Sequence, residues 1–157
     1  SQVLYVDKRN AAKPVEMYSQ AGKVGPAYCT GVGKAMLAFV EDDVLDHAIA
    51  QQSFHRFTPS TLDSPESLRE ELAAIRARGY AFDREEHEPG IVCIAVPILS
   101  NGGRMLGALS VTGPTSRTSL DQLETLAPRV LETAKRIGEE AEAWRFPETR
   151  QQKVETT

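Results

Sequence analysis

The sequence has little cysteine, few aromatic residues and no long hydrophobic run. Cysteine occurs twice in 157 residues, at Cys29 and Cys93, without the spacing of a metal site. The pair predicts reduced thiols, although a single disulfide stays open. No stretch reaches the roughly 18 apolar residues of a membrane span, and no signal-peptide pattern begins the chain. We therefore expect a cytoplasmic protein without membrane contact, and no pattern calls for a metal or a cofactor.

Positively charged residues are also fewer than negatively charged ones. Eighteen Lys and Arg stand against 22 Asp and Glu, which gives a net charge of -4. This balance argues against DNA binding by the segment itself. The length fits one domain, which we expect to span residues 1–146, with a polar and disordered tail at 147–157. Because the chain begins with Ser1, we expect it to be a piece of a longer protein.

In the first half of the chain, short β-favouring runs precede helical patterns. Residues 3–6 and 15–18 predict strands, and the glycines and proline of residues 22–26 predict a loop. Helices are expected from about Gly31 and over residues 42–52. A third helix is predicted between the N-cap and first-turn pair at residues 64–65 and a stop signal at residue 79.

The second half reads as strands followed by a helix. Apolar runs predict strands at residues 80–83, 91–99 and 104–112, the last two joined by a hairpin turn at residues 100–103. Ser119 and Gln122 form a capping box for a final helix, which Pro128 should kink or split. Hairpins without regular strand–helix alternation favour an α+β domain on an antiparallel sheet.

The run Thr30-Gly31-Val32-Gly33-Lys34 is the first candidate site. Free N–H groups at a helix start attract an anion, and glycines let a ligand approach the backbone. The P-loop pattern fails, because its first glycine is missing and Ala35 replaces the hydroxyl residue. The alternative interpretation is that the two glycines only permit tight packing of the helix.

The acidic segment 83–88 and Cys93 allow several interpretations. The segment could be a metal or acid–base cluster, but such a run is more often a solvated loop. Asp83 differs because it ends an apolar strand and could point inward. Cys93 reads as a small buried hydrophobe, or as a nucleophile if His87 served as its base.

Ser110 and Thr112 share one face of a predicted strand and could line a polar pocket or face solvent. Together with the helix start, the carboxylate of Asp83 and the thiol of Cys93, they suit a small hydroxy or keto acid better than a nucleotide.

Four blocks along the chain together resemble the C-terminal effector-binding domain of the IclR family of bacterial regulators, from about Val3 to Ala143. The blocks are residues 30–38 (TGVGKAMLA), 79–86 (GYAFDREE) with Gly90, 93–98 (CIAVPI) and 108–114 (ALSVTGP). Residues 17–19 and 26–28 further resemble the branch that controls sugar-acid catabolism.

The resemblance implies a GAF-like fold, a curved antiparallel sheet with helices packed on its faces. It also implies an N-terminal winged helix-turn-helix, absent from this chain, and homodimers or homotetramers. A small carboxylate would bind at the glycine-rich helix start. The positions that match the family's pocket are Gly31, Val32, Asp83, Cys93, Ser110, Thr112 and Met17. At Gly25 and Pro14 the family has larger apolar residues, which predicts a roomier pocket and a longer, more hydroxylated effector.

The expected function is a binding switch without chemistry, in which a small organic acid alters DNA binding by the missing domain. Three alternatives stay open. The first is a GAF-fold thiol reductase that uses Cys93 with Cys29. The second is a dimerisation module built on the final helix. The third is a zinc site formed by Asp83, His87 or Cys93, although no ligand spacing favours it.

Overall fold

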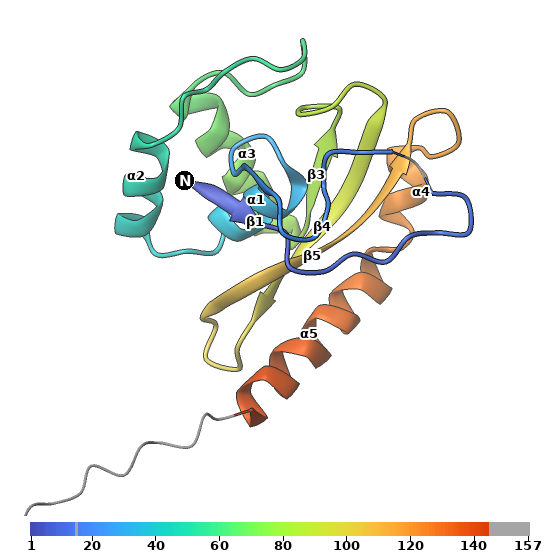
Figure 1. Cartoon of the computed structure of the whole chain (residues 1–157). Helices are drawn as coiled ribbons and strands as arrows, with labels where there is room; N and C mark the ends of the chain where they lie inside the picture. Colours follow the sequence, from blue (N-terminus) through green and yellow to red (C-terminus); the bar gives the residue numbers. More distant parts are fainter. Residues whose placement is uncertain (15, 145–157) are drawn as a thin grey trace, which may run out of the picture.

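A three-stranded antiparallel sheet organises the molecule (Figure 1). The structure, a computed structural model, describes residues 1–14 and 16–144. The strands are β3 (Ala81–Arg84), β4 (Ile91–Leu99) and β5 (Met105–Pro114), in that spatial order. The predicted hairpin turn joins β4 to β5, and Gly103 takes its positive φ of 83° there. The α+β prediction is therefore confirmed.

Strand β4 is central, and its side chains alternate between two covered faces. Val92, Ile94 and Val96 pack with the C-terminal helices, whereas Cys93 and Ala95 point toward the helix that begins at Gly31. This two-sided burial explains why residues 91–99 form a nearly continuous apolar run. The strand ends irregularly, with a register shift between Ile98 and Leu99 just beyond Pro97.

One helix packs against a face of the sheet, and two further helices pack in the core beside it. They are α1 (Gly31–Leu37), α2 (Asp42–Ala50) and α3 (Pro65–Arg78). The signals predicted for α3 are all present. Ser64 and Ser67 form a capping box, Pro65 occupies the first turn, and Gly79 ends the helix with φ 94°.

The opposite face is covered by α4 (Leu120–Glu124) and α5 (Ala127–Ala143). The expected capping box of Ser119 and Gln122 begins α4. The predicted break at Pro128 is also found, because this proline lies in the first turn of a new helix. Helix α5 buries its small and apolar stripe against its own sheet, at Ala127, Val130, Ala134 and Gly138.

Two predictions near the N-terminus, one of a strand and one of a loop, are wrong. Residues 16–18 form no strand, and the predicted loop at residues 22–26 contains strand β2 (Val24–Pro26), which pairs antiparallel with β1 (Gln2–Leu4). The cause is long-range pairing: Gly25 lies opposite Val3, and this contact outweighs the weak local preference of glycine and proline for a strand.

The predicted tail at residues 147–157 lies outside the described residues, as does Val15. Among the helices of the described part, none is both long and apolar enough to cross a membrane.

Candidate small-molecule pocket

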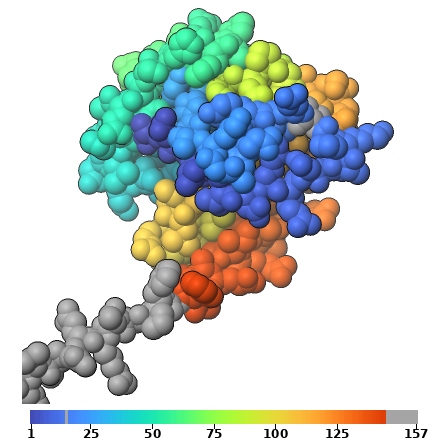
Figure 2. All heavy atoms as spheres, viewed as in Figure 1, coloured from blue at the N-terminus to red at the C-terminus, as the bar shows by residue number. Residues whose placement is uncertain are grey.

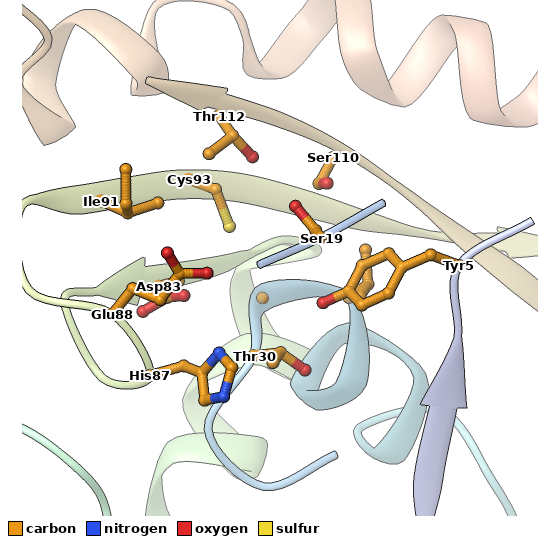
Figure 3. A pocket seen from close by; sticks show the side chains of 12 residues that line it. Tyr5, Ser19, Thr30, Asp83, His87, Glu88, Ile91, Cys93, Ser110 and Thr112 are labelled. Atoms are coloured by element: carbon orange, nitrogen blue, oxygen red, sulfur yellow. The ribbon is translucent and has the colours of Figure 1, made fainter. Parts of the chain in front are cut away.

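A small pocket lies between the start of α1, the face of the sheet and the N-terminal segment (Figure 3). The N-terminal segment and the α1 start contribute one group of lining residues: Tyr5, Ser19, Thr30, Gly31 and Val32. The sheet and the loop after β3 contribute the other: Asp83, His87, Glu88, Ile91, Cys93, Ser110 and Thr112. Most of these residues carry a polar group. Such a lining does not support the interpretation of the domain as a dimerisation module alone.

Sheet register explains how residues far apart in the sequence meet here. Asp83 pairs with Cys93, and Cys93 pairs with Thr112, so one row crosses all three strands. Ser110 lies in the next row on the same face, opposite Ala95. Of the two alternatives left open for Ser110 and Thr112, the structure therefore shows the first, since both residues line the pocket.

The α1 start presents backbone donors to this pocket. Thr30 is the N-cap, and its hydroxyl accepts from the Gly33 N–H at 3.2 Å. Within the described residues, no hydrogen bond uses the N–H of Gly31 or Val32. Two donors near the positive end of the helix are thus left beside the sheet residues.

Tight packing also requires both glycines of α1. A Cβ on Gly31 would overlap the sulfur of Cys93, and a Cβ on Gly33 would overlap the backbone of Ala27. The packing interpretation is therefore correct, and it is compatible with the anion-binding one. Because Gly31 has no side chain, the helix start lies directly against the row of Cys93.

Lys34 is not among the residues that line the pocket. It is fully buried, and its ammonium donates to Glu86 Oε2 at 2.7 Å and to the Phe82 carbonyl at 2.6 Å. Glu71 lies 3.7 Å from the same nitrogen. The solvated-loop interpretation of the acidic segment is wrong for Glu86, which is buried because it pairs with Lys34.

Asp83 points inward, as its place at the end of a strand suggested. It is 7% exposed, and its Oδ1 accepts from the Glu86 N–H at 2.8 Å. The pKa of Asp83 is raised to about 7. Burial is the largest cause and the neighbouring Glu86 carboxylate adds to it, whereas the Glu86 N–H and Lys34 oppose the rise. The Asp83 carboxyl group can therefore hold a proton near neutral pH.

The two thiols lack the properties of a reductase. Both are buried and free, and burial raises the pKa of each to about 12. Burial also lowers the pKa of His87. Within residues 1–14 and 16–144, no group of three His, Cys, Asp or Glu side chains is placed to hold a metal. The structure therefore favours neither the enzyme nor the zinc alternative.

The described residues of the segment between β1 and β2 pass in front of the sheet in Figure 1 and lie on the surface in Figure 2, and Tyr5 and Ser19 of this segment line the pocket. The segment is held by bonds from Tyr18 N to Glu88 Oε1 at 2.6 Å and from Gly22 N to the Tyr5 carbonyl at 2.7 Å. Tyr5 packs over Gly25, where a side chain would contact its ring. The pocket volume is about 40 Å³, and the Tyr5 ring occupies the space beside Gly25, so the roomier pocket stays a prediction.

Sequence reasoning missed several lining residues. Met17, a predicted wall residue, is not among those that line the pocket, although its neighbour Ser19 is. Thr30 could have been found as a helix N-cap. Tyr5 had no comparable signal, because its position depends on the pairing of β1 with β2. His87 also borders a second cleft, of about 640 Å³.

Comparison with known proteins identifies relatives across nearly the whole chain. The family described as "Bacterial transcriptional regulator IclR C-terminal" matches residues 1–139. The regulator BhcR of Paracoccus denitrificans is 36% identical over 87% of the chain and 49% of its own length. The regulator KdgR of Escherichia coli is 32% identical over 87% of the chain and 52% of its own length. The chain thus spans about half the length of these relatives.

Solved structures give the same result. The IclR protein of Thermotoga maritima superposes with a TM-score of 0.81 at 31% identity, covering 88% of the chain and 57% of that protein. The inducer-binding domain of PobR from Acinetobacter, a double mutant in complex with 3-hydroxybenzoic acid, gives 0.73 at 31% identity, covering 80% and 73%. The expected GAF-like fold is confirmed, since these neighbours share it.

Proposed function

Because the chain belongs to the IclR family of bacterial transcriptional regulators, whose C-terminal domain it matches, we propose that it is the ligand-sensing domain of such a regulator. Its ligand is a small carboxylate of the keto-acid or sugar-acid class. It has no catalytic activity of its own. It acts in the cytoplasm, where its occupancy alters DNA binding by an N-terminal winged helix-turn-helix, and it works as a homodimer or homotetramer.

The observation that carries this proposal is the pair of free N–H groups at Gly31 and Val32, which lies beside a polar sheet face. Backbone donors at a helix start suit a carboxylate. The hydroxyls of Ser110 and Thr112 suit the keto or hydroxyl oxygens of the same molecule. PobR, a structural neighbour, was crystallised with a hydroxylated aromatic acid.

The proposed mechanism is a shift of population. An acid that binds one arrangement of domains or subunits more tightly raises the share of that arrangement, in proportion to its differential affinity. The segment between β1 and β2 is a suitable moving part, because it contributes Tyr5 and Ser19 to the pocket. A pocket of about 40 Å³ holds only a few water molecules. A sugar acid is larger, so the segment between β1 and β2 has to move before it can bind.

Titration calorimetry with a panel of acids tests the proposal. The panel contains keto acids of two and three carbons, six-carbon sugar acids, a hydroxybenzoate, and the corresponding neutral sugars and alcohols. We expect heat with at least one acid and none with its neutral counterpart. Heat with neutral sugars or nucleotides and none with any acid would contradict the carboxylate assignment.

The variant Thr112→Val keeps the shape of the side chain and removes its hydroxyl. We expect it to weaken acid binding about tenfold, the effect of one lost hydrogen bond. Thr133→Val on the exposed side of α5 is the matched control and should leave binding unchanged.

A further inference from the structure

The charge balance of the pocket conflicts with an anionic ligand. Asp83 and Glu88 both line the pocket, and no lysine or arginine is among the lining residues. Of the described residues that line it, His87 alone has a basic side chain, and burial lowers its pKa. A ligand carboxylate would therefore enter next to two protein carboxyl groups, a placement that disfavours three negative charges together.

The charged and titratable groups near Asp83 come from α1, from the loop after β3, from β4 and from the segments after β1 and before α1. Among the described residues, Lys34 of α1 is the cation that acts on Asp83, and its ammonium is already bonded to Glu86. Glu86 and Glu88 follow on the loop after β3. The remaining titratable groups are Tyr5 after β1, Cys29 before α1 and Cys93 on β4, each neutral because its pKa is raised to about 12. In this group, the ammonium of Lys34 thus stands against the carboxyl groups of Asp83, Glu86 and Glu88.

The geometry of Asp83 leaves one oxygen free for a proton. Its Oδ1 accepts the Glu86 N–H, and no hydrogen bond between described residues uses Oδ2. Figure 3 shows the carboxyl group beside Cys93 and Glu88, on the wall opposite Tyr5. A proton on Oδ2 would turn this oxygen into a donor toward the ligand.

On the premise of the proposed function, we propose that the acid binds together with one proton, which the solvent supplies and Asp83 Oδ2 holds against a ligand oxygen. Asp83 is then a specificity-determining residue. In its protonated form it donates to a carboxylate or keto oxygen, and in its ionised form it repels the same ligand. Binding is consequently linked to pH, and protonated Asp83 replaces the cationic side chain that the pocket lacks.

Calorimetry of the chain in buffers of different ionisation enthalpy measures the protons taken up per ligand. At about pH 8.5, where Asp83 is ionised in the free protein, we expect about one proton per acid bound. At about pH 5.5 the uptake should fall to nearly zero. The affinity should weaken about tenfold for each pH unit above neutrality.

Two isosteric variants locate the proton. Asp83→Asn carries a permanent donor, so it should bind the acid with no uptake and with an affinity that does not change with pH. Asp121→Asn, at an exposed position of α4 outside the pocket lining, should keep the uptake of the unmodified chain. If Asp83→Asn does not fold, the pH midpoint of the uptake in the unmodified chain locates the proton, at about pH 7 for Asp83 and below pH 6.5 for His87, whose pKa is lowered by burial.

Acid binding without proton uptake at about pH 8.5 would overturn this inference and leave the proposed function intact. Uptake that persists in Asp83→Asn, or that disappears in Asp121→Asn, would overturn it as well. The absence of binding by any acid at either pH would instead overturn the proposed function and, with it, this inference.

Discussion

Lys34 and Glu86 form a buried ion pair between α1 and the loop after β3, with side chains 0% and 4% exposed. Glu86 depends strongly on this partner, because its Oε1 is buried without any hydrogen bond in the described structure. Removing one member of such a pair leaves the other charge in a medium of low polarity. The pair therefore fixes the loop that carries His87 and Glu88 into the pocket wall.

We expect Lys34→Met to lower the free energy of unfolding by about 3–5 kcal/mol, since it leaves Glu86 buried and uncompensated. Chemical denaturation measures the change. The double variant Lys34→Met/Glu86→Gln should recover a large part of the loss, because the orphaned charge is gone.

Lys135→Met on the exposed side of α5 is the control for the loss of a lysine and should change little. A Lys34→Met variant as stable as this control would show that the pair contributes nothing net to stability.

The pocket residues differ in how far the sequence could predict them. Asp83 was predictable because it directly follows apolar residues of a strand, so its direction depends on local alternation. The burial of Glu86 was not, because it depends on Lys34, which lies 52 residues earlier in the chain. In an acidic run, the sequence does not indicate which carboxylate forms an ion pair with a buried cation.

Among helices and strands, those whose signals lie within their own segment were predicted more accurately than those that depend on pairing with a distant segment. Helix α3 has its cap, its first-turn proline and its terminal glycine within the segment itself, and its limits were predicted closely. Strand β2 has three residues, and only its pairing with β1 makes it a strand. The side of the pocket formed by the segment between β1 and β2 was therefore harder to predict than the side formed by the sheet, where β4 and β5 are joined by a local turn.

Helix α5 offers a test in which helix propensity and packing predict opposite signs. Gly138 is buried, and a Cβ there would overlap the carbonyl oxygen of Leu99 at the end of β4. Propensity alone predicts that Gly138→Ala stabilises the helix by about 1 kcal/mol. We expect packing to prevail, because the obstacle is backbone, and the variant to be less stable by about 1–3 kcal/mol.

Thermal denaturation of Gly138→Ala beside Thr133→Ala measures this balance. Thr133 is exposed on the same helix, so its replacement should stabilise by a few tenths of a kcal/mol through propensity alone. If both variants are stabilised equally, α5 does not pack on β4 as closely as the structure indicates.

At the scale of the whole molecule, the buried Asp83 carboxyl group links global stability to pH. Its pKa is about 7 in the folded chain, whereas an aspartate in an unfolded chain has a pKa of about 3.9. Between these values the folded state holds a proton that the unfolded state has lost. Stability therefore falls as pH rises through this window, by at most about 1.4 kcal/mol per unit from this group. Above about pH 7 the contribution is constant, because both states are ionised.

Asp83→Asn isolates this contribution, since the amide does not titrate. The free energy of unfolding of the ligand-free chain, minus that of the variant, should decline from about pH 4 to about pH 7 and then level off. Asp7→Asn, at an exposed position, serves as the control for the change of charge. His87 and Glu71 have lowered pKa values and so act in the opposite direction, losing stability as pH falls, but they are common to both chains and cancel. A difference that rises with pH in this window would mean that the folded chain stabilises ionised Asp83, and the pocket would then have no proton to share with an acid.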